Sequence, residues 1–411
     1  MNIVKTLETQ TLKNLLTLFI AGLLFWLSLT LLLPIIPTYI EDTGATTQQI
    51  GVVMGCFAIG LLLSRTKLGQ LADYRGRKIV VLIGTLVAGL APLGYPLTHS
   101  LTGLIIIRAF HGICLAAFTT GYSALVVDLS PPKRKGELIG YMSMINPIGM
   151  SLGPAWGGFL STVVGYDTVF IISASLGLAA FILTLQVTES GKLEDNKFKE
   201  KRQPRRNFWQ LMGDRSLRIP AAVMMQVGLV FGTIITFVPL YIRETNIDLN
   251  PGLFYTAAAL TSFSMRVMSG KASDRYGRGI FISTGLICYL LSMVLLSFAH
   301  TPEMFILSGV LEGAGGGTLI PLMVALMSDR STADQRGQFY AFCLGGFDLG
   351  LAMAGPILGF FADTLGYQGI YLIGAALALQ ALIIFATLSS KNIGHSLGFA
   401  LGKKPDIYAL D

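Results

Sequence analysis

Residues 69–78 read GQLADYRGRK, and residues 270–278 read GKASDRYGR. The two stretches share a glycine, an aspartate and a closing Gly-Arg pair at identical spacing, and they lie 201 positions apart. Self-similarity at a fixed displacement is the signature of an internal repeat. The chain is therefore predicted to consist of two homologous halves, each carrying one copy of this stretch.

The same displacement holds in other parts of the chain. It maps Gly112 onto Gly313, Asp128 onto Asp329, Gly136 onto Gly337, and Gly165-Tyr166 onto Gly366-Tyr367. Chance would not preserve one displacement across so many residue types. Each half is therefore expected to have the same number of structural elements in the same orientation, which is the parallel-repeat arrangement of one large transporter class.

Composition places both halves in a membrane. Of the 411 residues, 53% are hydrophobic and only 13% are charged, against about 25% charged residues in soluble domains. The apolar runs of roughly 18–25 residues are long enough to cross a hydrocarbon core about 30 Å thick. The predicted spans lie near residues 15–40, 48–66, 79–98, 102–126, 138–162 and 167–187, and near 219–242, 252–270, 279–299, 303–327, 338–362 and 367–389.

The distribution of positive charge orients these spans. Of the 30 Lys and Arg residues, all but Arg108 and Arg243 fall in the termini, in the loops on one side, or in the ends of the spans that border those loops. Short cytoplasmic loops carry such an excess, so both termini are predicted to be cytoplasmic. The net charge of +7 is thereby explained without a nucleic-acid partner.

The domain organisation follows from these spans. We expect a first six-helix bundle at residues 1–187 and a second at 219–390, joined by a cytoplasmic linker at 188–218 and followed by a cytoplasmic tail at 391–411. The linker is charged and poor in apolar residues, but its last part, FWQLMGDRSLR, mixes aromatic and basic residues and favours a short interfacial helix. The four cysteines all lie in apolar runs, which predicts neither a metal site nor a disulfide.

The repeated stretch resembles the signature loop between helices 2 and 3 of the major facilitator superfamily, and the resemblance covers essentially the whole chain. It implies an all-α membrane protein with 12 transmembrane helices in two pseudo-symmetric six-helix bundles. In that family, transport proceeds by rocking of the two bundles about a central cavity. Leu33-Pro34-Ile-Ile-Pro37 at the end of helix 1 looks like the twelve-helix drug/proton antiporter group.

The loop residues suggest a latch that opens and closes. A carboxylate at a helix end can accept hydrogen bonds from nearby Arg side chains or face the positive N-terminus of a neighbouring helix. The resemblance implies that the loop steadies the state closed to the cytoplasm. The residues assigned to this gating role are Gly69, Asp73, Gly76, Arg77, Gly270, Asp274, Gly277 and Arg278. The alternative is that they only set topology and turn geometry.

Helix 5 resembles the antiporter motif of the same family. The matching residues are Gly140, Gly149, Gly153, Pro154, Gly157 and Gly158. Glycines spaced by four residues lie on one helix face and allow close packing, while proline removes a backbone donor and bends the helix. The motif is expected to act as a hinge in exporters that exchange protons for solute. Ordinary small-residue packing is the alternative.

Four charged or titratable side chains lie well inside the spans, away from their ends: Arg108, His111, Glu312 and Asp348. Such residues usually face a cavity and serve function, because a charge facing lipid costs at least about 2.5 kcal/mol at the bilayer centre. Glu312, the counterpart of His111 in the repeat, is expected to be the main proton-carrying acid, with Asp348 second. Arg108 matches the family's intramembrane arginine, implicated in proton coupling. A static polar network is the alternative, and helix 1 lacks the acid found there in many relatives.

Helices 1 and 7 line the cavity in the family, and here they carry mainly apolar and aromatic groups. Trp26, Thr30, Gln226 and Phe237 are the candidate substrate-lining residues. Such a lining favours amphipathic or lipophilic solutes. These side chains could equally face neighbouring helices or lipid.

The sequence thus predicts a plasma-membrane (inner-membrane) transporter working by alternating access, with proton-coupled efflux of a small amphipathic or lipophilic solute preferred. A facilitator or importer of sugars or other small metabolites, and a non-transporting receptor or scaffold, remain open. No catalytic constellation, cofactor motif or metal site is recognised, so we expect no enzyme activity and a proton gradient as the energy source. The expected partners are a small-molecule substrate and the lipid bilayer, with the protein monomeric.

Overall fold

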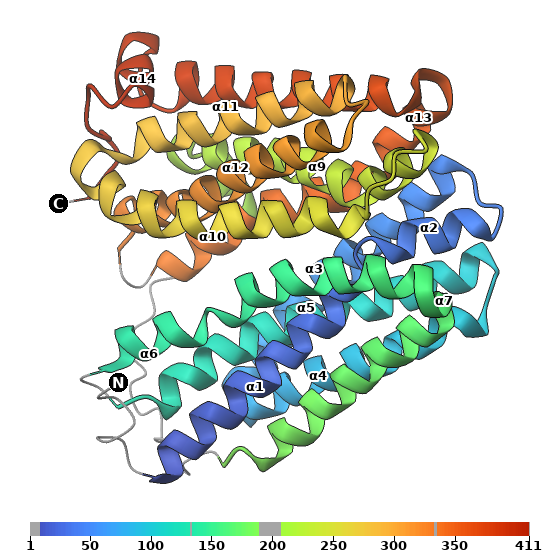
Figure 1. Ribbon diagram of the computed structural model, residues 1–411. Helices are drawn as coiled ribbons and strands as arrows, with labels where there is room; N and C mark the ends of the chain where they lie inside the picture. Colours follow the sequence, from blue (N-terminus) through green and yellow to red (C-terminus); the bar gives the residue numbers. More distant parts are fainter. Residues whose placement is uncertain (1–8, 132–133, 189–206, 333–334, 411) are drawn as a thin grey trace. The chain divides into compact units, whose positions relative to one another are not determined.

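The computed structural model describes residues 9–131, 134–188, 207–332 and 335–410. Throughout these residues the chain forms helices joined by short turns, and none of them lies in a strand (Figure 1). The helices are α1 (Thr9–Leu31), α2 (Ile35–Asp42), α3 (Thr47–Arg75), α4 (Arg77–Gly94), the 3-10 helix η1 (Tyr95–Leu97), α5 (Leu101–Leu129), α6 (Lys135–Met142), α7 (Ile145–Gln186), α8 (Phe208–Gly213), α9 (Arg215–Glu244), α10 (Pro251–Tyr276), α11 (Arg278–Ser297), α12 (Pro302–Asp329), α13 (Arg336–Leu388) and α14 (Ile393–Ala400).

A single glycine separates two pairs of consecutive helices. Gly76 alone lies between α3 and α4, and Gly277 alone lies between α10 and α11. Their φ angles are 98° and 89°, in a region that residues with a side chain rarely adopt. These two glycines of the repeated stretch therefore reverse the chain at the place where any other residue would be strained.

Two further glycines divide the longest helices. Gly165 within α7 has φ 77° and Gly366 within α13 has φ 66°, and both interrupt the helical backbone. The 42 residues of α7 would extend about 63 Å as one straight helix, twice the thickness of a hydrocarbon core. Each of these helices therefore contains two membrane-length segments, and the two breaks lie at equivalent positions of the repeat.

The described segments account for twelve spans. Nine continuous helical segments are long and apolar enough to cross a membrane. The breaks in α7 and α13 each add one more. The last is α10, whose 26 residues extend about 39 Å although Arg266 and polar residues near its end lower its hydropathy. The predicted all-α fold with twelve transmembrane helices is confirmed.

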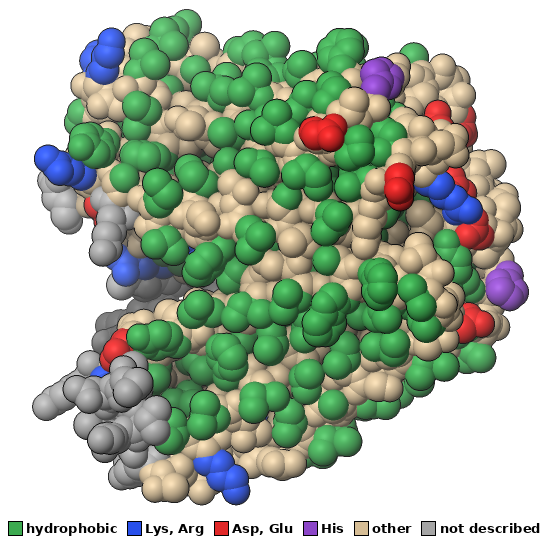
Figure 2. All heavy atoms as spheres, viewed as in Figure 1, with side chains coloured by type: hydrophobic (Ala, Val, Ile, Leu, Met, Phe, Trp, Pro, Cys, Tyr) green, Lys and Arg blue, Asp and Glu red, His purple; other side chains and the backbone are tan. Residues whose placement is uncertain are grey.

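The sides of the helices carry hydrophobic side chains. In Figure 2, few charged side chains interrupt this surface between the helix ends. Large exposed residues include Ile59, Leu63, Phe159, Leu260 and Phe360. Such a surface would be a liability in water, whereas lipid tails solvate it without penalty.

The helices form two compact units, one of Met1–Ala45 and Cys56–Lys197 and the other of Thr46–Gly55 and Phe198–Asp411. Much of the predicted linker at 188–218 lies outside the described residues. Its last part contains α8 and the first turn of α9, so the seventh span begins at Arg215. The predicted tail at 391–411 contains a helix, α14.

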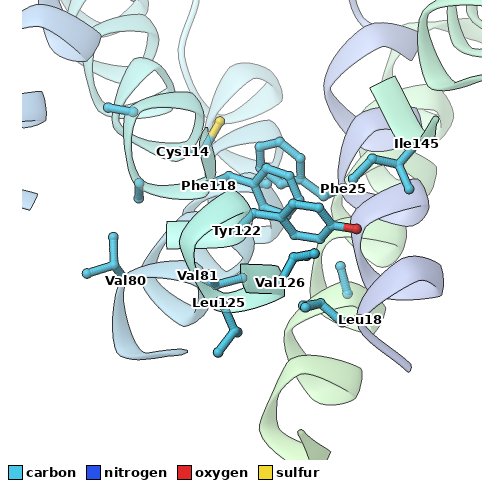
Figure 3. Packing of buried hydrophobic residues seen from close by; sticks show 14 of the residues in the cluster. Leu18, Phe25, Val80, Val81, Cys114, Phe118, Tyr122, Leu125, Val126 and Ile145 are labelled. Atoms are coloured by element: carbon cyan, nitrogen blue, oxygen red, sulfur yellow. The ribbon is translucent and has the colours of Figure 1, made fainter. Parts of the chain in front are cut away.

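The core of the first unit lies where α1, α4, α5 and α7 pack together (Figure 3). The rings of Phe25 and Phe118 stack with their centroids 3.8 Å apart, and Tyr122 stacks on Phe118 at 4.7 Å. Aliphatic side chains such as Val81 and Ile145 surround the three rings. This aromatic column joins α1 to α5 and fixes the face that α5 presents to the rest of the unit.

Equivalent glycines bring equivalent helices together in the two units. A Cβ atom on Gly112 of α5 would collide with the carbonyl oxygen of Phe57 on α3. In the second unit, a Cβ on Gly313 of α12 would collide with the carbonyl oxygen of Ala258 on α10. Both members of each contact are related by the displacement found in the sequence, so the repeat extends to close helix packing.

We expect Gly313→Ala to lower stability, because its methyl group would overlap the Ala258 backbone; overpacking of this kind costs about 1–3 kcal/mol. Thermal unfolding of the purified protein in detergent provides the measurement. Gly345→Ala on α13 is the matched control, since no described atom lies within 4 Å of the position its Cβ would occupy. Equal melting temperatures for the two variants would contradict the close-packing assignment.

Candidate functional site

Arg108 and His111 lie one turn apart on α5, a helix whose start is capped by Ser100, which accepts a hydrogen bond from Gly103 N at 3.2 Å. Arg108 is 5% exposed and His111 is fully buried. Residues three apart share a helix face, so both side chains project from α5 in a similar direction. Arg108 and His111 therefore lie near each other on one face of α5, within the first unit.

Aromatic side chains from other elements hold these two residues. The Tyr95 hydroxyl lies 3.0 Å from His111 Nδ1, and the Tyr39 hydroxyl donates to the Tyr95 carbonyl oxygen at 2.9 Å. The Phe57 ring lies 4.5 Å from the Arg108 guanidinium carbon and packs edge-on against His111. Elements η1, α2 and α3 thus fix the polar face of α5.

The polar face of α5 retains unused hydrogen-bonding capacity. Arg108 Nε and His111 Nε2 are buried and have no hydrogen-bond partner within the described part of the chain. Buried polar atoms are normally paired. An arginine and a histidine with open positions inside a membrane bundle form a site that can bind or respond to charge.

The second unit places a carboxylate at the equivalent position. Glu312 on α12 is 6% exposed, and its Oε1 accepts a hydrogen bond from the Tyr289 hydroxyl of α11 at 3.5 Å. A Cβ on Gly316 would lie 3.0 Å from that hydroxyl and 3.5 Å from Oε1. Glycine at position 316 therefore leaves room for the acid and its tyrosine partner.

Asp348 belongs to the same unit but to a different helix. It is 6% exposed on α13. A Cβ on either Gly346 or Gly350 would collide with a backbone carbonyl of α9. Positions two residues apart on a helix point about 200° away from each other, so Asp348 projects away from the face that packs on α9. The two predicted acids, Glu312 and Asp348, thus lie on α12 and α13 of the same unit.

Each signature loop holds an ion pair with the end of a later helix. Arg77 at the start of α4 pairs with Asp128 near the end of α5, and its Nη1 also donates to the Ala124 carbonyl oxygen at 3.0 Å. Arg278 at the start of α11 pairs with Asp329 at the end of α12, where Nη2 donates to Oδ1 at 3.0 Å. The displacement relates both members of the two pairs.

The sequence pattern relates Asp128 to Asp329 through the repeat but indicates no role for either residue. It predicts Asp73 and Asp274 as the acids of the latch instead. In the structure Asp274 lies 3.7 Å from Arg278, farther than Asp329 does. The signal that could have identified the partners is the conserved separation of each Arg–Asp pair between the two halves.

Two other predicted loop glycines make no close contact. Gly69 and Gly270 lie inside α3 and α10, and apart from the neighbouring backbone of their own helix no atom lies within 4 Å of the place where a Cβ would be. Gly76 and Gly277 make the turns instead. The alternative role of setting turn geometry thus applies to one glycine in each copy of the loop.

The helix 5 motif is divided between two helices. Gly140 lies on the short helix α6 with open space beside it, whereas Gly149, Gly153 and Gly157 lie on α7 and pack against α1. Pro154 and Gly158 are also buried on α7. The glycines spaced by four residues therefore form a packing face within the first unit.

The predicted substrate-lining residues occupy different environments. Thr30 is buried on α1, and its hydroxyl donates to the Gly149 carbonyl oxygen at 2.8 Å. Phe237 is fully buried beside Tyr367 in the second unit. Both side chains therefore pack between helices of their own unit. Trp26 is only partly buried, and Gln226 is buried with an Oε1 that has no partner among the described residues.

The comparisons with known proteins agree with this architecture. The sequence model of the Major Facilitator Superfamily matches residues 18–271 and 251–405. Multidrug resistance protein MdtG of Escherichia fergusonii is 26% identical over 382 residues, covering 90% of this chain and 93% of that protein. An uncharacterized MFS-type transporter of Methanocaldococcus jannaschii is 25% identical over 382 residues, covering 90% of this chain and 97% of that protein.

Solved structures share the fold at low sequence identity. A bacterial homolog of the human lysosomal transporter Spinster aligns with TM-score 0.74 and 15% identity, covering 98% of this chain and 99% of that one. The nucleoside transporter NupG aligns with TM-score 0.75 and 13% identity, covering 90% and 98% respectively. The twelve spans, the repeated Arg–Asp pairs and a family match over nearly the whole sequence show that this chain belongs to the major facilitator superfamily of membrane transporters.

Proposed function

We propose that this protein exports lipophilic or amphipathic solutes in exchange for protons. The observation that carries the proposal is the carboxyl group of Glu312, buried in the membrane-spanning helix α12 beside a tyrosine hydroxyl. Acids at this depth are rare outside solute and proton pathways because of the free energy of burying their charge. The similarity to multidrug resistance proteins supports drug-like solutes as the cargo.

The proton and the solute would compete for Glu312. The carboxylate accepts a hydrogen bond from Tyr289 but keeps a negative charge that needs a further partner. Either a proton or a polar group of the solute can satisfy it. Because each would bind one facing state of the transporter better than the other, entry of a proton would drive release of the solute.

The site in the first unit carries a positive charge. Arg108 carries a permanent positive charge, and His111 occupies the position of Glu312 in the repeat. Their open nitrogen positions would let them bind polar groups of a solute. We therefore assign Arg108 to proton coupling and His111 to an accessory role.

The repeated ion pairs would act as latches. The side chains of Arg77 and Asp128 are 36% and 48% exposed, and those of Arg278 and Asp329 are 23% and 35% exposed. Pairs exposed to this extent contribute only about 0–1 kcal/mol. They can hold one facing state and still part during each transport cycle.

The protein would work as a monomer in the plasma membrane, with both termini in the cytoplasm. A membrane potential supplies about 2.3 kcal/mol per elementary charge per 100 mV, which is sufficient to drive uphill efflux. Purified protein in liposomes with an imposed pH gradient tests the proposal against a panel of lipophilic cations, antibiotics and sugars. Uphill movement of sugars alone, or movement indifferent to the gradient, would refute it.

In this assay we expect Glu312→Gln to abolish uphill efflux, because the amide cannot carry a proton. The drop in rate should exceed about tenfold, equivalent to 1.4 kcal/mol. Thermal unfolding should be close to that of the parent protein, since the amide can still accept from Tyr289. Glu137→Gln, at an exposed acid on α6, is the matched control and should transport normally. Efflux at the parent rate in Glu312→Gln would exclude this acid as the proton carrier.

Arg77→Ala and Asp128→Ala should slow transport through the same lost contact. The double variant should therefore be no slower than the more impaired single variant. The coupling free energy from the cycle should be about 0.5–1 kcal/mol, given the partial exposure of both side chains. Additive effects of the two substitutions would show that the pair is not the working unit of the latch.

A further inference from the structure

The C-terminal segment folds back onto one end of the second unit. The Ala400 carbonyl oxygen at the end of α14 accepts a hydrogen bond from Ser283 Oγ of α11 at 3.0 Å. Phe399 is 4% exposed, and its ring lies 5.8 Å from that of Phe385 on α13. Gly402, with φ 70°, then turns the chain in the manner of a glycine after a helix end. The tail is thus an integral part of this unit.

Arg330 connects this tail to three helices. Its Nε and Nη2 donate to the two carboxylate oxygens of Asp406 at 2.6 and 3.0 Å. Nη1 donates to the Ser216 carbonyl oxygen at 2.7 Å and Nη2 to that of Ser389 at 3.3 Å. The guanidinium also lies over the Tyr408 ring. The starting turn of α9, the end of α12, the end of α13 and the tail therefore meet at one side chain.

Both side chains of this ion pair are largely buried. The Arg330 side chain is 1% exposed and that of Asp406 is 10% exposed. Their two parallel hydrogen bonds form the bidentate geometry typical of strong arginine–carboxylate pairs. Removing one member of a buried pair leaves an uncompensated charge, so the contact is hard to break.

The same tail reaches the gating pair of the second unit. Arg330 immediately follows Asp329, the partner of Arg278. Leu410 N donates to the Asp329 carbonyl oxygen at 2.8 Å. We call the Arg330–Asp406 ion pair the clamp. The clamp and the hydrogen bond from Leu410 both hold the backbone at Asp329, whose carboxylate binds Arg278.

The first unit has a different residue at the position of Arg330. The displacement that relates Asp128 to Asp329 places Leu129 there. A leucine cannot bind a carboxylate, so the Arg77–Asp128 latch cannot be fixed by a clamp of this kind. The two latches share their residues but differ in their support.

We propose that Arg330 is a positioning residue which, held by Asp406 of the C-terminal tail, keeps Asp329 in place for Arg278. The tail thereby makes the two latches differ in how strongly they resist opening. The latch of the second unit is stabilised by the clamp, whereas the Arg77–Asp128 latch is the one that opens readily. The asymmetry assigns a conformational role to a segment outside the two repeated bundles.

Backbone hydrogen exchange of the purified protein tests this proposal without any transported solute. In Asp406→Asn, exchange should accelerate by at least about tenfold in peptides from the end of α12 and the start of α11. Asp406→Glu should restore slow exchange, because it keeps the carboxylate. Asp363→Asn, an exposed acid on α13, removes the same charge elsewhere and should change neither peptide.

The pattern of exchange separates a positioning role from a merely structural one. Acceleration confined to the tail peptides, or equal acceleration throughout the second unit, would overturn the proposal. Because no transport is measured, failure here would leave the proton-coupling proposal standing, and the reverse also holds.

A second variant avoids leaving Arg330 buried without its partner. Arg330→Leu combined with Asp406→Asn gives the second unit the leucine that the first unit has at this position. It should exchange faster at the start of α11 while the peptides around Arg77 and Asp128 are unchanged. Unchanged exchange at the start of α11 in this double variant would also refute the positioning role.

Discussion

A backbone amide in hydrocarbon has no water to bind, so every span must satisfy its own hydrogen bonds as a helix. This constraint makes helix–helix packing the only freedom left to the chain. Lipid and apolar side chains attract each other about equally, so association depends on close fit. Gly112 against Phe57 and Gly313 against Ala258 provide that fit at equivalent positions. The polar side chains on α5 and α12 are then carried to defined places by helices whose spacing is set by glycine.

The same framework carries different chemistry in the two units. His111 and Glu312 occupy one position of the repeat, and each contacts a tyrosine hydroxyl from the preceding helical segment. One site contains a permanent cation, Arg108, and the other contains a carboxylate. The difference arises at two positions of the repeat, because Arg108 corresponds to Gly309 and His111 corresponds to Glu312.

The ends of the helices show the same combination of symmetry and divergence. Arg77–Asp128 and Arg278–Asp329 are the repeated contacts of the signature loops. Arg330 and the tail residue Asp406 add support to the second pair alone. A latch that is partly exposed opens at little cost in free energy, whereas one fixed by a buried, bidentate pair resists opening. Unequal latches would give the transport cycle a preferred place to open first.

The sequence by itself determined the class of protein, the number of spans and the repeat. The length of a hydrophobic run can be read along the chain, and a run of spanning length must form a helix in the bilayer. The constant displacement can also be read along the chain, and it indicates the repeat. Only the tertiary structure decided which side chains meet. Thr30 donates a hydrogen bond to the Gly149 carbonyl oxygen. Arg77 and Arg278 bind Asp128 and Asp329, and Arg330 binds Asp406. These contacts join residues far apart in the chain, and their partners depend on helix rotation and on the path of the tail, which no local pattern encodes.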